Sequence, residues 1–350
     1  MKAHAARPVA ELDVVALTRR LVDIESTTYN EGAVGRTLVE ILAGRSFAVE
    51  TMQVEQHRES RSASERFNVY GGAAGETPDV VLSTHMDTVP PFFPSSEDEG
   101  FIYGRGACDA KGIIAAQIVA AERLRAEGVR VGLLFVVGEE RDSAGAKVAN
   151  LHPRGSRFLI NGEPTDNRLA LASKGTLRVR LTATGKMAHS AYPELGESAI
   201  HKLIEALHRV MALPLPVTED VGPSTLNVGT LEGGRAPNVI ADHAEAQLLI
   251  RLVGPAEATR RAVVEAVGKL AAVDFTLEIP FQRLRKIEGL PTMVAAFTTD
   301  IPWLTEWGEP LLLGPGSIHV AHTPNEKLAK RELAEAVELY VKVARGLVGT

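Results

Sequence analysis

Residues 80–90 read VVLSTHMDTVP, an apolar run that passes into a polar loop. Pro78 precedes the run and a proline pair follows at 90–91, which is the pattern of a short buried strand with a loop at its end. His85 and Asp87 are two residues apart, so on an extended backbone their side chains point the same way. An imidazole beside a carboxylate there indicates a metal-bound histidine with an orienting carboxylate. Two ordinary polar residues at a strand end are the alternative.

The overall composition is that of an ordinary globular protein. The 350 residues are 45% hydrophobic and 23% charged, and the net charge of −6 argues against a general nucleic-acid binder. Cys108 is the single cysteine, so neither an intramolecular disulfide nor a cysteine-based zinc cluster can form. Met1 to Arg7 lacks the apolar core of a secretory signal, and no apolar run approaches membrane-spanning length. We therefore expect a cytoplasmic protein that does not bind membranes.

Helical and strand patterns alternate through the first half of the chain. Helices are expected over 11–24, 32–42 and 113–125, and strands over 47–54, 66–70, 79–83, 131–137 and 158–160. Residues 91–101 are expected to be loop. This alternation predicts a doubly wound α/β domain with a mainly parallel sheet, and the polar residues after the strands are expected at its ligand-binding edge.

The pattern changes near Lys174. Elements are expected over 176–184, 198–211, 225–231, 243–252, 256–270 and 275–279, in the βαββαβ order of a ferredoxin-like α+β unit. A strand at 308–313 and a helix at 331–348 would return to the first domain. We therefore expect a catalytic domain formed by 1–174 and 284–350, with 175–283 inserted as a second domain.

Five candidate metal ligands lie at or beyond strand ends or in the glycine-rich segment 104–112: His85, Asp109, Glu140, Glu163 and His322. Imidazole and carboxylate ligands suit Zn²⁺ or a similar divalent ion. Five exceed what one tetrahedral site with a water needs, so we infer two ions that share a ligand and activate a water between them.

Glu139 stands directly before one of these candidate ligands. Consecutive side chains diverge, so Glu140 can bind metal while Glu139 faces the substrate as a general base. A solvated acidic turn is the alternative, because Arg141 and Asp142 follow immediately.

Five motifs in order resemble the peptidase M20 family of metallohydrolases. They are HMDTVP at 85–90, GRGACDAKG at 104–112, GEE at 138–140, NGEPT at 161–165 and AHTPNE at 321–326. This family includes acetylornithine deacetylase, succinyl-diaminopimelate desuccinylase, aminoacylase and glutamate carboxypeptidase, and the resemblance covers nearly the whole chain.

The resemblance implies that Asp109 bridges two ions, Zn²⁺ or alternatively Co²⁺. It assigns one further ligand pair to each ion: His85 and Glu163 to the first, Glu140 and His322 to the second. Glu139 would be the general acid/base, and Asp87 would orient His85. The family commonly has a cis peptide after the bridging aspartate, which is here the bond between Asp109 and Ala110.

The inserted segment also resembles the family. GKMAHS at 185–190 is similar to a lid motif whose histidine reaches across a homodimer, so His189 is a candidate for stabilising the tetrahedral intermediate in trans. GGRAPNVI at 233–240 resembles the segment whose asparagine contacts substrate, here Asn238. Arg251 occupies the strand where the family often places a carboxylate-binding arginine, and Lys174 at the domain junction is a further substrate-binding candidate. Surface roles for His189 and Arg251 are the alternatives.

What the resemblance implies for function is a dimetal amidohydrolase acting on a small N-acyl amino acid. Residues 314–326 are most similar to acetylornithine deacetylase, an enzyme of arginine biosynthesis. The alternatives are succinyl-diaminopimelate desuccinylase, a related lysine- or citrulline-pathway deacylase, an exopeptidase acting on short peptides, and a non-catalytic binding protein of the same fold.

Overall fold

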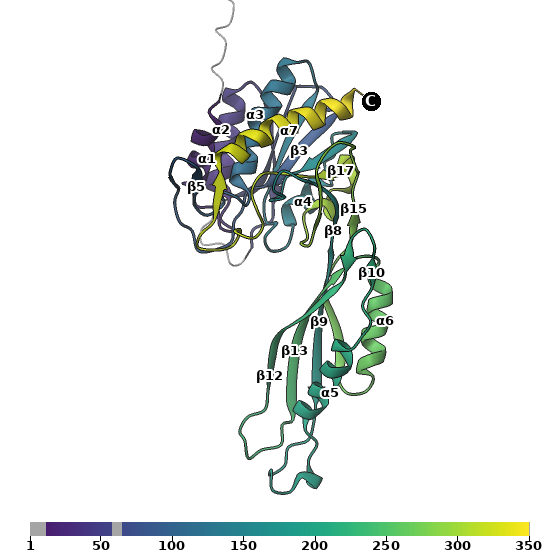
Figure 1. Ribbon diagram of the computed structural model, residues 1–350. Helices are drawn as coiled ribbons and strands as arrows, with labels where there is room; N and C mark the ends of the chain where they lie inside the picture. The colour runs from purple at the N-terminus through teal and green to yellow at the C-terminus, as the bar shows by residue number, and fades with distance from the viewer. Residues whose placement is uncertain (1–11, 58–64, 350) are drawn as a thin grey trace, which may run out of the picture. The chain divides into compact units, whose positions relative to one another are not determined.

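The computed structural model describes residues 12–57 and 65–349, which form two compact units (Figure 1). The first unit comprises Met1–Ala170, Leu284–Met293 and Thr299–Thr350, and the second comprises Leu171–Arg283 and Val294–Thr298. The expectation about a signal at residues 1–7 falls outside the described residues.

The main sheet of the first unit has the strand order β1-β2-β6-β3-β7-β17. The strands span Ala48–Val54 (β1), Arg66–Gly72 (β2), Val131–Val136 (β6), Val80–His85 (β3), Phe158–Asn161 (β7) and Glu309–Leu312 (β17). From β6 to β17 the strands run parallel, whereas β1 and β2 are antiparallel to their neighbours. This confirms the expected mainly parallel sheet and adds an antiparallel extension at one edge.

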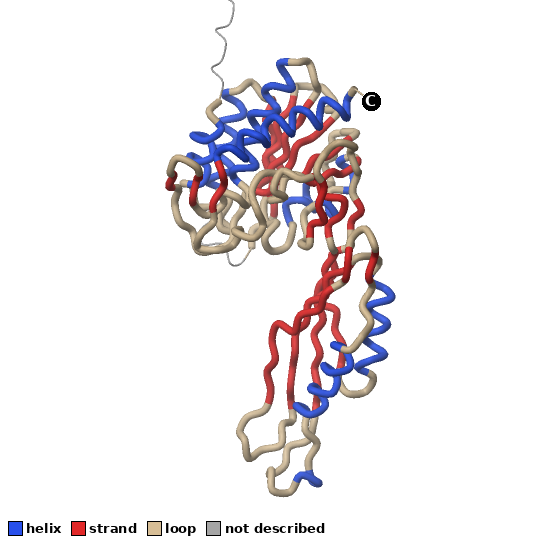
Figure 2. The backbone as a smooth tube through the Cα atoms, viewed as in Figure 1, coloured by secondary structure: helices blue, strands red, loops and turns tan. Residues whose placement is uncertain are grey.

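Alternating side chains of the central strands build two hydrophobic cores, one on each face of this sheet. Val80 and Leu82 pack with α1 (Val14–Val22), α2 (Gly32–Gly44), α3 (Lys111–Ala126) and α7 (Lys330–Val348). Val81, between them, packs in a second core that includes α4 (Ala144–Ala149) and Trp307. Because period-2 alternation sends neighbours to opposite faces, the continuous apolar runs reflect burial on both faces, and the sheet is doubly wound (Figure 2).

The segment 91–101, expected to be loop, contains one short strand and the first residue of another, so that expectation is wrong in part. β4 (Ser96–Glu97) pairs with β5 (Phe101–Tyr103), and β5 pairs with β18 (Lys327–Ala329). The Asp98 carboxylate accepts the backbone N–H groups of Gly100 and Phe101 and closes the turn between β4 and β5. Strands of two or three residues are too short to show a periodicity, and β18, one of the two partners of β5, lies more than 200 residues away.

The second unit has an antiparallel sheet in the order β12-β13-β9-β14. These strands span Thr225–Gly233 (β12), His243–Leu252 (β13), Gly175–Thr184 (β9) and Ala272–Ile279 (β14). α5 (Ala199–Met211) and α6 (Ala256–Val267) pack against the alternating buried positions of this sheet. The chain order βαββαβ and the strand order 2-3-1-4 confirm the ferredoxin-like arrangement.

Several small elements complete the chain. A three-stranded sheet has the order β15-β8-β16, formed by Gln282–Arg283, Leu169–Ser173 and Thr292–Ala295. A two-stranded sheet joins β10 (Val217–Thr218) to β11 (Gly222–Pro223), and the short 3₁₀ turns are η1 (Pro193–Leu195), η2 (Ile301–Trp303) and η3 (Thr305–Trp307).

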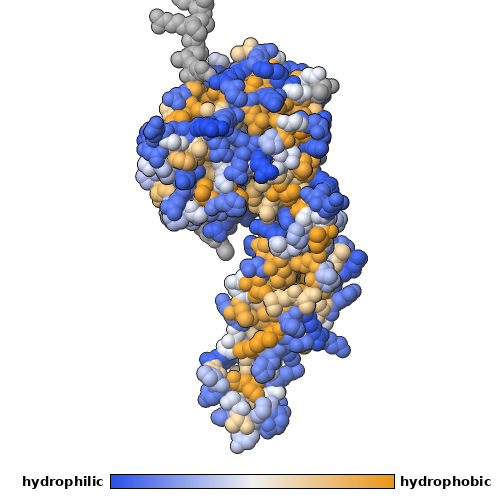
Figure 3. Space-filling model, in the orientation of Figure 1, coloured by the Kyte–Doolittle hydropathy of each residue, from blue (hydrophilic) through white to orange (hydrophobic). Residues whose placement is uncertain are grey.

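The surface of the second unit carries many hydrophobic residues (Figure 3). Among the described residues, eight of the nine exposed large hydrophobic side chains belong to this unit: Met187, Tyr192, Leu195, Ile204, Met211, Val217, Leu231 and Val264. Within the same residues, we find no helix with the length and apolar character that crossing a bilayer requires.

Candidate metal centre

The parallel strands of the first unit bring the five candidate ligands to one edge of the sheet. His85 is the last residue of β3, Glu140 follows β6, Glu163 follows β7 and His322 lies beyond β17. Asp109 precedes α3, and the peptide bond after it is cis, as the resemblance implied. Because the carboxyl ends of parallel strands meet at the same edge, residues far apart in sequence converge here.

Asp109 lies between the two histidines. Its Oδ1 is 3.0 Å from Nε2 of His85, and its Oδ2 is 3.3 Å from Nε2 of His322. The same Nε2 of His322 is 2.9 Å from Oε1 of Glu140, and Oε2 of Glu163 is 4.0 Å from Nε2 of His85. Each oxygen of Asp109 thus faces a different histidine–glutamate pair, which is the arrangement that a shared carboxylate ligand requires.

Two further observations fit a divalent cation at this position. Ligand atoms of His85, Asp109 and Glu140 all lie within 4.8 Å of one another. Glu163 is buried, and its Oε1 has no hydrogen-bond partner among the described residues. A buried carboxylate oxygen without a donor is costly unless a cation satisfies it, so the donor set fits the group that the resemblance implies.

The carboxylates of the centre titrate differently because their neighbours differ. Desolvation, and then the charge of Glu163, raise the pKa of Glu139 well above its usual range. Burial likewise raises the pKa of Glu163 well above normal. Burial would also raise the pKa of Asp109, but hydrogen bonds from His322 and His85 outweigh it and hold that pKa below its usual range. The charged form is therefore favoured more strongly in Asp109 than in these two glutamates.

The two histidines have elevated pKa values. Hydrogen bonds to Asp109 and then Glu140 raise the pKa of His322 to about 10. Burial opposes the charged form of His85, yet contacts with Asp109 and Asp87 hold its pKa well above normal. His322 also has φ 63°, a left-handed backbone that residues other than glycine seldom adopt, and such strain is concentrated at functional sites.

Asp87 lies beside His85 and makes further contacts that the sequence did not predict. Nδ1 of His85 lies 3.0 Å from the backbone oxygen of Asp87 and 3.6 Å from its Oδ1. The Asp87 carboxylate accepts shorter hydrogen bonds from the Thr28 hydroxyl at 2.8 Å and from the backbone N–H groups of Glu139 at 3.1 Å and Glu140 at 3.3 Å. Thr28 is 59 positions upstream of Asp87, and no local pattern marks it.

Glu326 closes the motif at 321–326 and was given no role from the sequence. Its Oε1 accepts the backbone N–H groups of Gly106, Cys108 and Asp109 at 2.9, 3.2 and 3.1 Å. Its Oε2 pairs with the buried Arg105 at 2.5 Å. The carboxylate of Glu326 therefore fixes the glycine-rich segment that carries Asp109.

Glu326→Ala is expected to lower the free energy of unfolding by about 3–5 kcal/mol, because it leaves the buried Arg105 without its carboxylate partner. The control is Glu309→Ala, which breaks the exposed pair with Arg285 and is expected to cost less than about 1 kcal/mol. Urea unfolding of the metal-free proteins measures both, and equal losses would contradict the assigned contacts.

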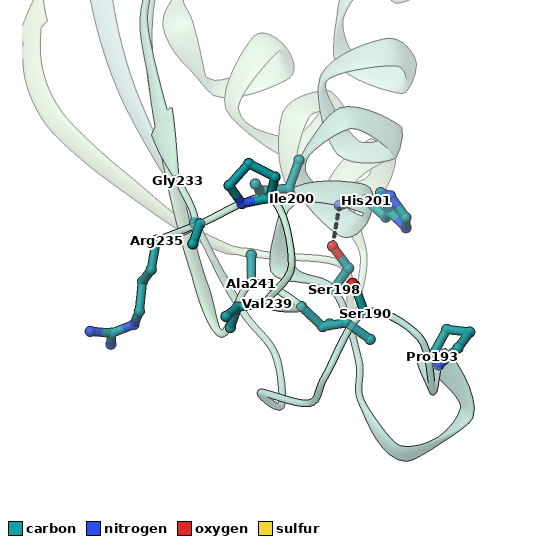
Figure 4. A pocket seen from close by; sticks show the side chains of 13 residues that line it. Ser190, Pro193, Ser198, Ile200, His201, Gly233, Arg235, Val239 and Ala241 are labelled. Atoms are coloured by element: carbon teal, nitrogen blue, oxygen red, sulfur yellow. Dashed lines mark hydrogen bonds between the residues drawn. The ribbon is translucent and has the colours of Figure 1, made fainter.

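The four remaining candidates all lie in the second unit. His189 and Asn238 are exposed. They lie in neighbouring loop segments, since the backbone N–H of Ser190 donates to the Asn238 carbonyl at 3.0 Å. These segments border a hollow of about 660 Å³ whose wall includes Ser190, Ser198 and Val239 (Figure 4). Arg251 donates to the Thr176 hydroxyl at 2.7 Å, and Lys174 donates to the Pro223 carbonyl at 2.6 Å.

Fold and centre together define a two-unit α/β protein with a histidine–carboxylate cluster at the carboxyl edge of its main sheet. Residues 81–346 match the family described as Peptidase family M20/M25/M40, and the chain belongs to this family. The resemblance to the M20 family is thereby confirmed, and with it the assignment to the hydrolases.

Relatives and solved structures agree with this assignment. A peptidase M20 domain-containing protein of Schizosaccharomyces pombe is 39% identical over 95% of this chain and 84% of its own length. A protein of Paracoccidioides brasiliensis named probable carboxypeptidase is 37% identical over 96% of this chain and 85% of its own.

Among solved structures, the aminopeptidase PepT of Bacillus cereus has a TM-score of 0.77 at 21% identity, covering 96% of this chain and 98% of that one. The Bacillus subtilis YXEP protein, described as a dinuclear metal-binding peptidase of the M20 family, has a TM-score of 0.65 at 15% identity and covers 95% of this chain and 96% of its own. At these identities the two structures show the shared fold alone.

Proposed function

We propose that this protein is a dimetal exopeptidase that releases a C-terminal amino acid from a short peptide. The observation that carries the proposal is the placement of Asp109 between His85 and His322, each accompanied by a glutamate. The relative named probable carboxypeptidase supports a peptide substrate over the acetylornithine-type substrate favoured by the sequence.

The proposed ligands are those expected from the sequence, with Asp109 shared, His85 and Glu163 on one ion, and Glu140 and His322 on the other. When bound, two ions such as Zn²⁺ or Co²⁺ would polarise the scissile carbonyl and lower the pKa of a water between them.

Glu139 would take the proton of the attacking water and deliver it to the leaving nitrogen. Its raised pKa brings the carboxyl group nearer to working pH, which suits a group that must accept and then return a proton. His189 of the partner subunit would donate to the developing oxyanion, as proposed from the lid motif. The exposed hydrophobic residues of the second unit support a homodimer formed through that unit.

Arg251 and Lys174 are proposed to bind the substrate carboxylate, with Asn238 as a further contact. Burial, and then the charge of Arg251, lower the pKa of Lys174, so the two cations are close enough to repel. Neither has a carboxylate partner among the described residues, and an anionic ligand would relieve the repulsion.

An N-acyl amino acid presents the same carboxylate beside its amide bond, so deacylation is the second candidate function.

A substrate panel separates these functions. We expect an N-blocked dipeptide with a free C-terminus to be hydrolysed by metal-loaded enzyme, and the same peptide with an amidated C-terminus to react at least about 100-fold more slowly. N-acetylornithine and N-succinyl-diaminopimelate test deacylation. Equal turnover of the free and amidated peptides would overturn the carboxypeptidase proposal, and turnover of an N-acyl amino acid alone would establish the deacylase instead.

Metal binding is expected to release protons and to tighten as pH rises toward about 10. At pH 7 to 8 the metal-free His322 is protonated because its pKa is raised to about 10, and an imidazole must be neutral to bind metal. Calorimetry in buffers of different ionisation enthalpy measures the released protons.

Two substitutions serve as controls for this linkage. His322→Gln is expected to reduce the release by about one proton, whereas His319→Gln, three residues away, leaves it unchanged. An affinity that does not change with pH would contradict the assignment of His322.

A further inference from the structure

We propose that Thr28 is a positioning residue that acts through Asp87 on the two glutamates at 139–140. The inference rests on the proposed function, because it concerns the general base and a metal ligand of that reaction. It assigns to the Asp87 carboxylate a task other than orienting His85. This task is to fix the turn after β6 by accepting its backbone N–H groups.

The Asp87 carboxylate joins two distant parts of the first unit. It is fully buried, and the Thr28 hydroxyl donates to Oδ2 at 2.8 Å. The backbone N–H of Glu139 donates to Oδ1 at 3.1 Å, and that of Glu140 donates to Oδ2 at 3.3 Å. The imidazole of His85 is farther away, with Nδ1 3.6 Å from Oδ1. The shortest of these contacts is therefore the one from Thr28.

Thr28 is itself held in place on both sides. Its backbone N–H donates to the Thr88 carbonyl at 3.1 Å, and the N–H of Thr88 donates to the Ser26 carbonyl at 2.9 Å. Tyr29 follows with φ 79°, and its ring stacks on His57 with 4.1 Å between ring centroids. The hydroxyl donor is thus pre-positioned, so its hydrogen bond fixes the rotation of the Asp87 carboxylate.

Loss of this hydroxyl would loosen the turn that carries both glutamates. Oδ2 of Asp87 would keep only the longer hydrogen bond from Glu140, and the carboxylate would turn more freely about its terminal torsion. A displacement of about 1 Å at a reacting group can cost about 100-fold in rate. The effect should fall on kcat, because the Thr28 hydroxyl donates to Asp87 and, among the described residues, to no proposed ligand side chain.

Three variants test the proposal. Thr28→Val removes the hydroxyl at nearly constant shape, and Thr28→Ser keeps it. Thr18→Val is the matched control, because Thr18 is also buried and its hydroxyl donates to the Val14 carbonyl at 2.8 Å within α1. The readouts are kcat, KM, metal content, and amide hydrogen exchange of the peptide spanning 137–143 in metal-free protein.

Thr28→Val is expected to lower kcat about tenfold with KM and metal content within about twofold of wild type. Exchange in the peptide spanning 137–143 should accelerate while α3 and β13 stay protected. Thr28→Ser should keep the wild-type kcat and the wild-type exchange of this peptide. Thr18→Val should change neither kcat nor this exchange. Wild-type kcat or unchanged local exchange in Thr28→Val, or equal defects in the Val and Ser variants, would overturn the proposal. If the wild type hydrolyses no amide, the proposed function fails, whereas the exchange result still decides the positioning role.

Discussion

Glu139→Gln is expected to lower kcat by about 10²–10⁴-fold while metal content stays that of the wild type. The substitution keeps size and polarity but removes the group that would accept the proton of the attacking water. KM should change little, because Glu139 makes no proposed contact with the ground-state substrate. Steady-state hydrolysis of the best peptide, with elemental analysis of the same samples, measures both quantities.

The neighbouring residue provides the matched control. Glu140→Gln alters a proposed ligand, with Oε1 of Glu140 2.9 Å from His322, so this variant should lose about one ion per chain together with its activity. Only a difference in metal content between the two variants is consistent with their proposed roles. A Glu139→Gln enzyme with ordinary turnover, or one that has lost its metal, would remove Glu139 from the role of general base.

Asp109→Asn is expected to abolish binding of both ions and with it detectable hydrolysis. Asparagine carries no charge and offers a single acceptor oxygen, whereas both carboxylate oxygens of Asp109 face histidines. Glu163→Gln should by contrast retain about one ion per chain, because Glu163 is proposed to serve one site only. Metal titration by calorimetry measures both stoichiometries.

The Asp109 variant must also be shown to fold. Its circular dichroism and unfolding midpoint should match those of metal-free wild type. A folded Asp109→Asn protein that still binds two ions would contradict the shared-ligand assignment.

The fold could be predicted from the sequence where hydrophobic patterns are long. The apolar runs at 80–82 and 131–137 mark strands buried on both faces, and the alternation at 243–252 marks a strand buried on one. The strands at 96–97 and 101–103 could not be predicted, because two- and three-residue strands have no period and because β5 also pairs with the distant β18.

The candidate ligands could be predicted from the sequence, because their motifs place metal-binding residue types at or beyond the ends of predicted strands or in the glycine-rich segment. The structure places their side chains together, and whether they bind metal stays a prediction. The supporting contacts could not be foreseen. Glu326 reaches the backbone of Asp109 across 217 positions, and Thr28 reaches Asp87 across 59. These hydrogen bonds depend on tertiary structure, which no local spacing encodes.

The most direct test is hydrolysis of an N-blocked dipeptide by chelator-treated enzyme as Zn²⁺ or Co²⁺ is added back. The account predicts no turnover without metal and full turnover at about two ions per chain. Undiminished turnover by the metal-free enzyme, or no turnover at any metal content, would contradict the claim that this centre is a dimetal peptidase site.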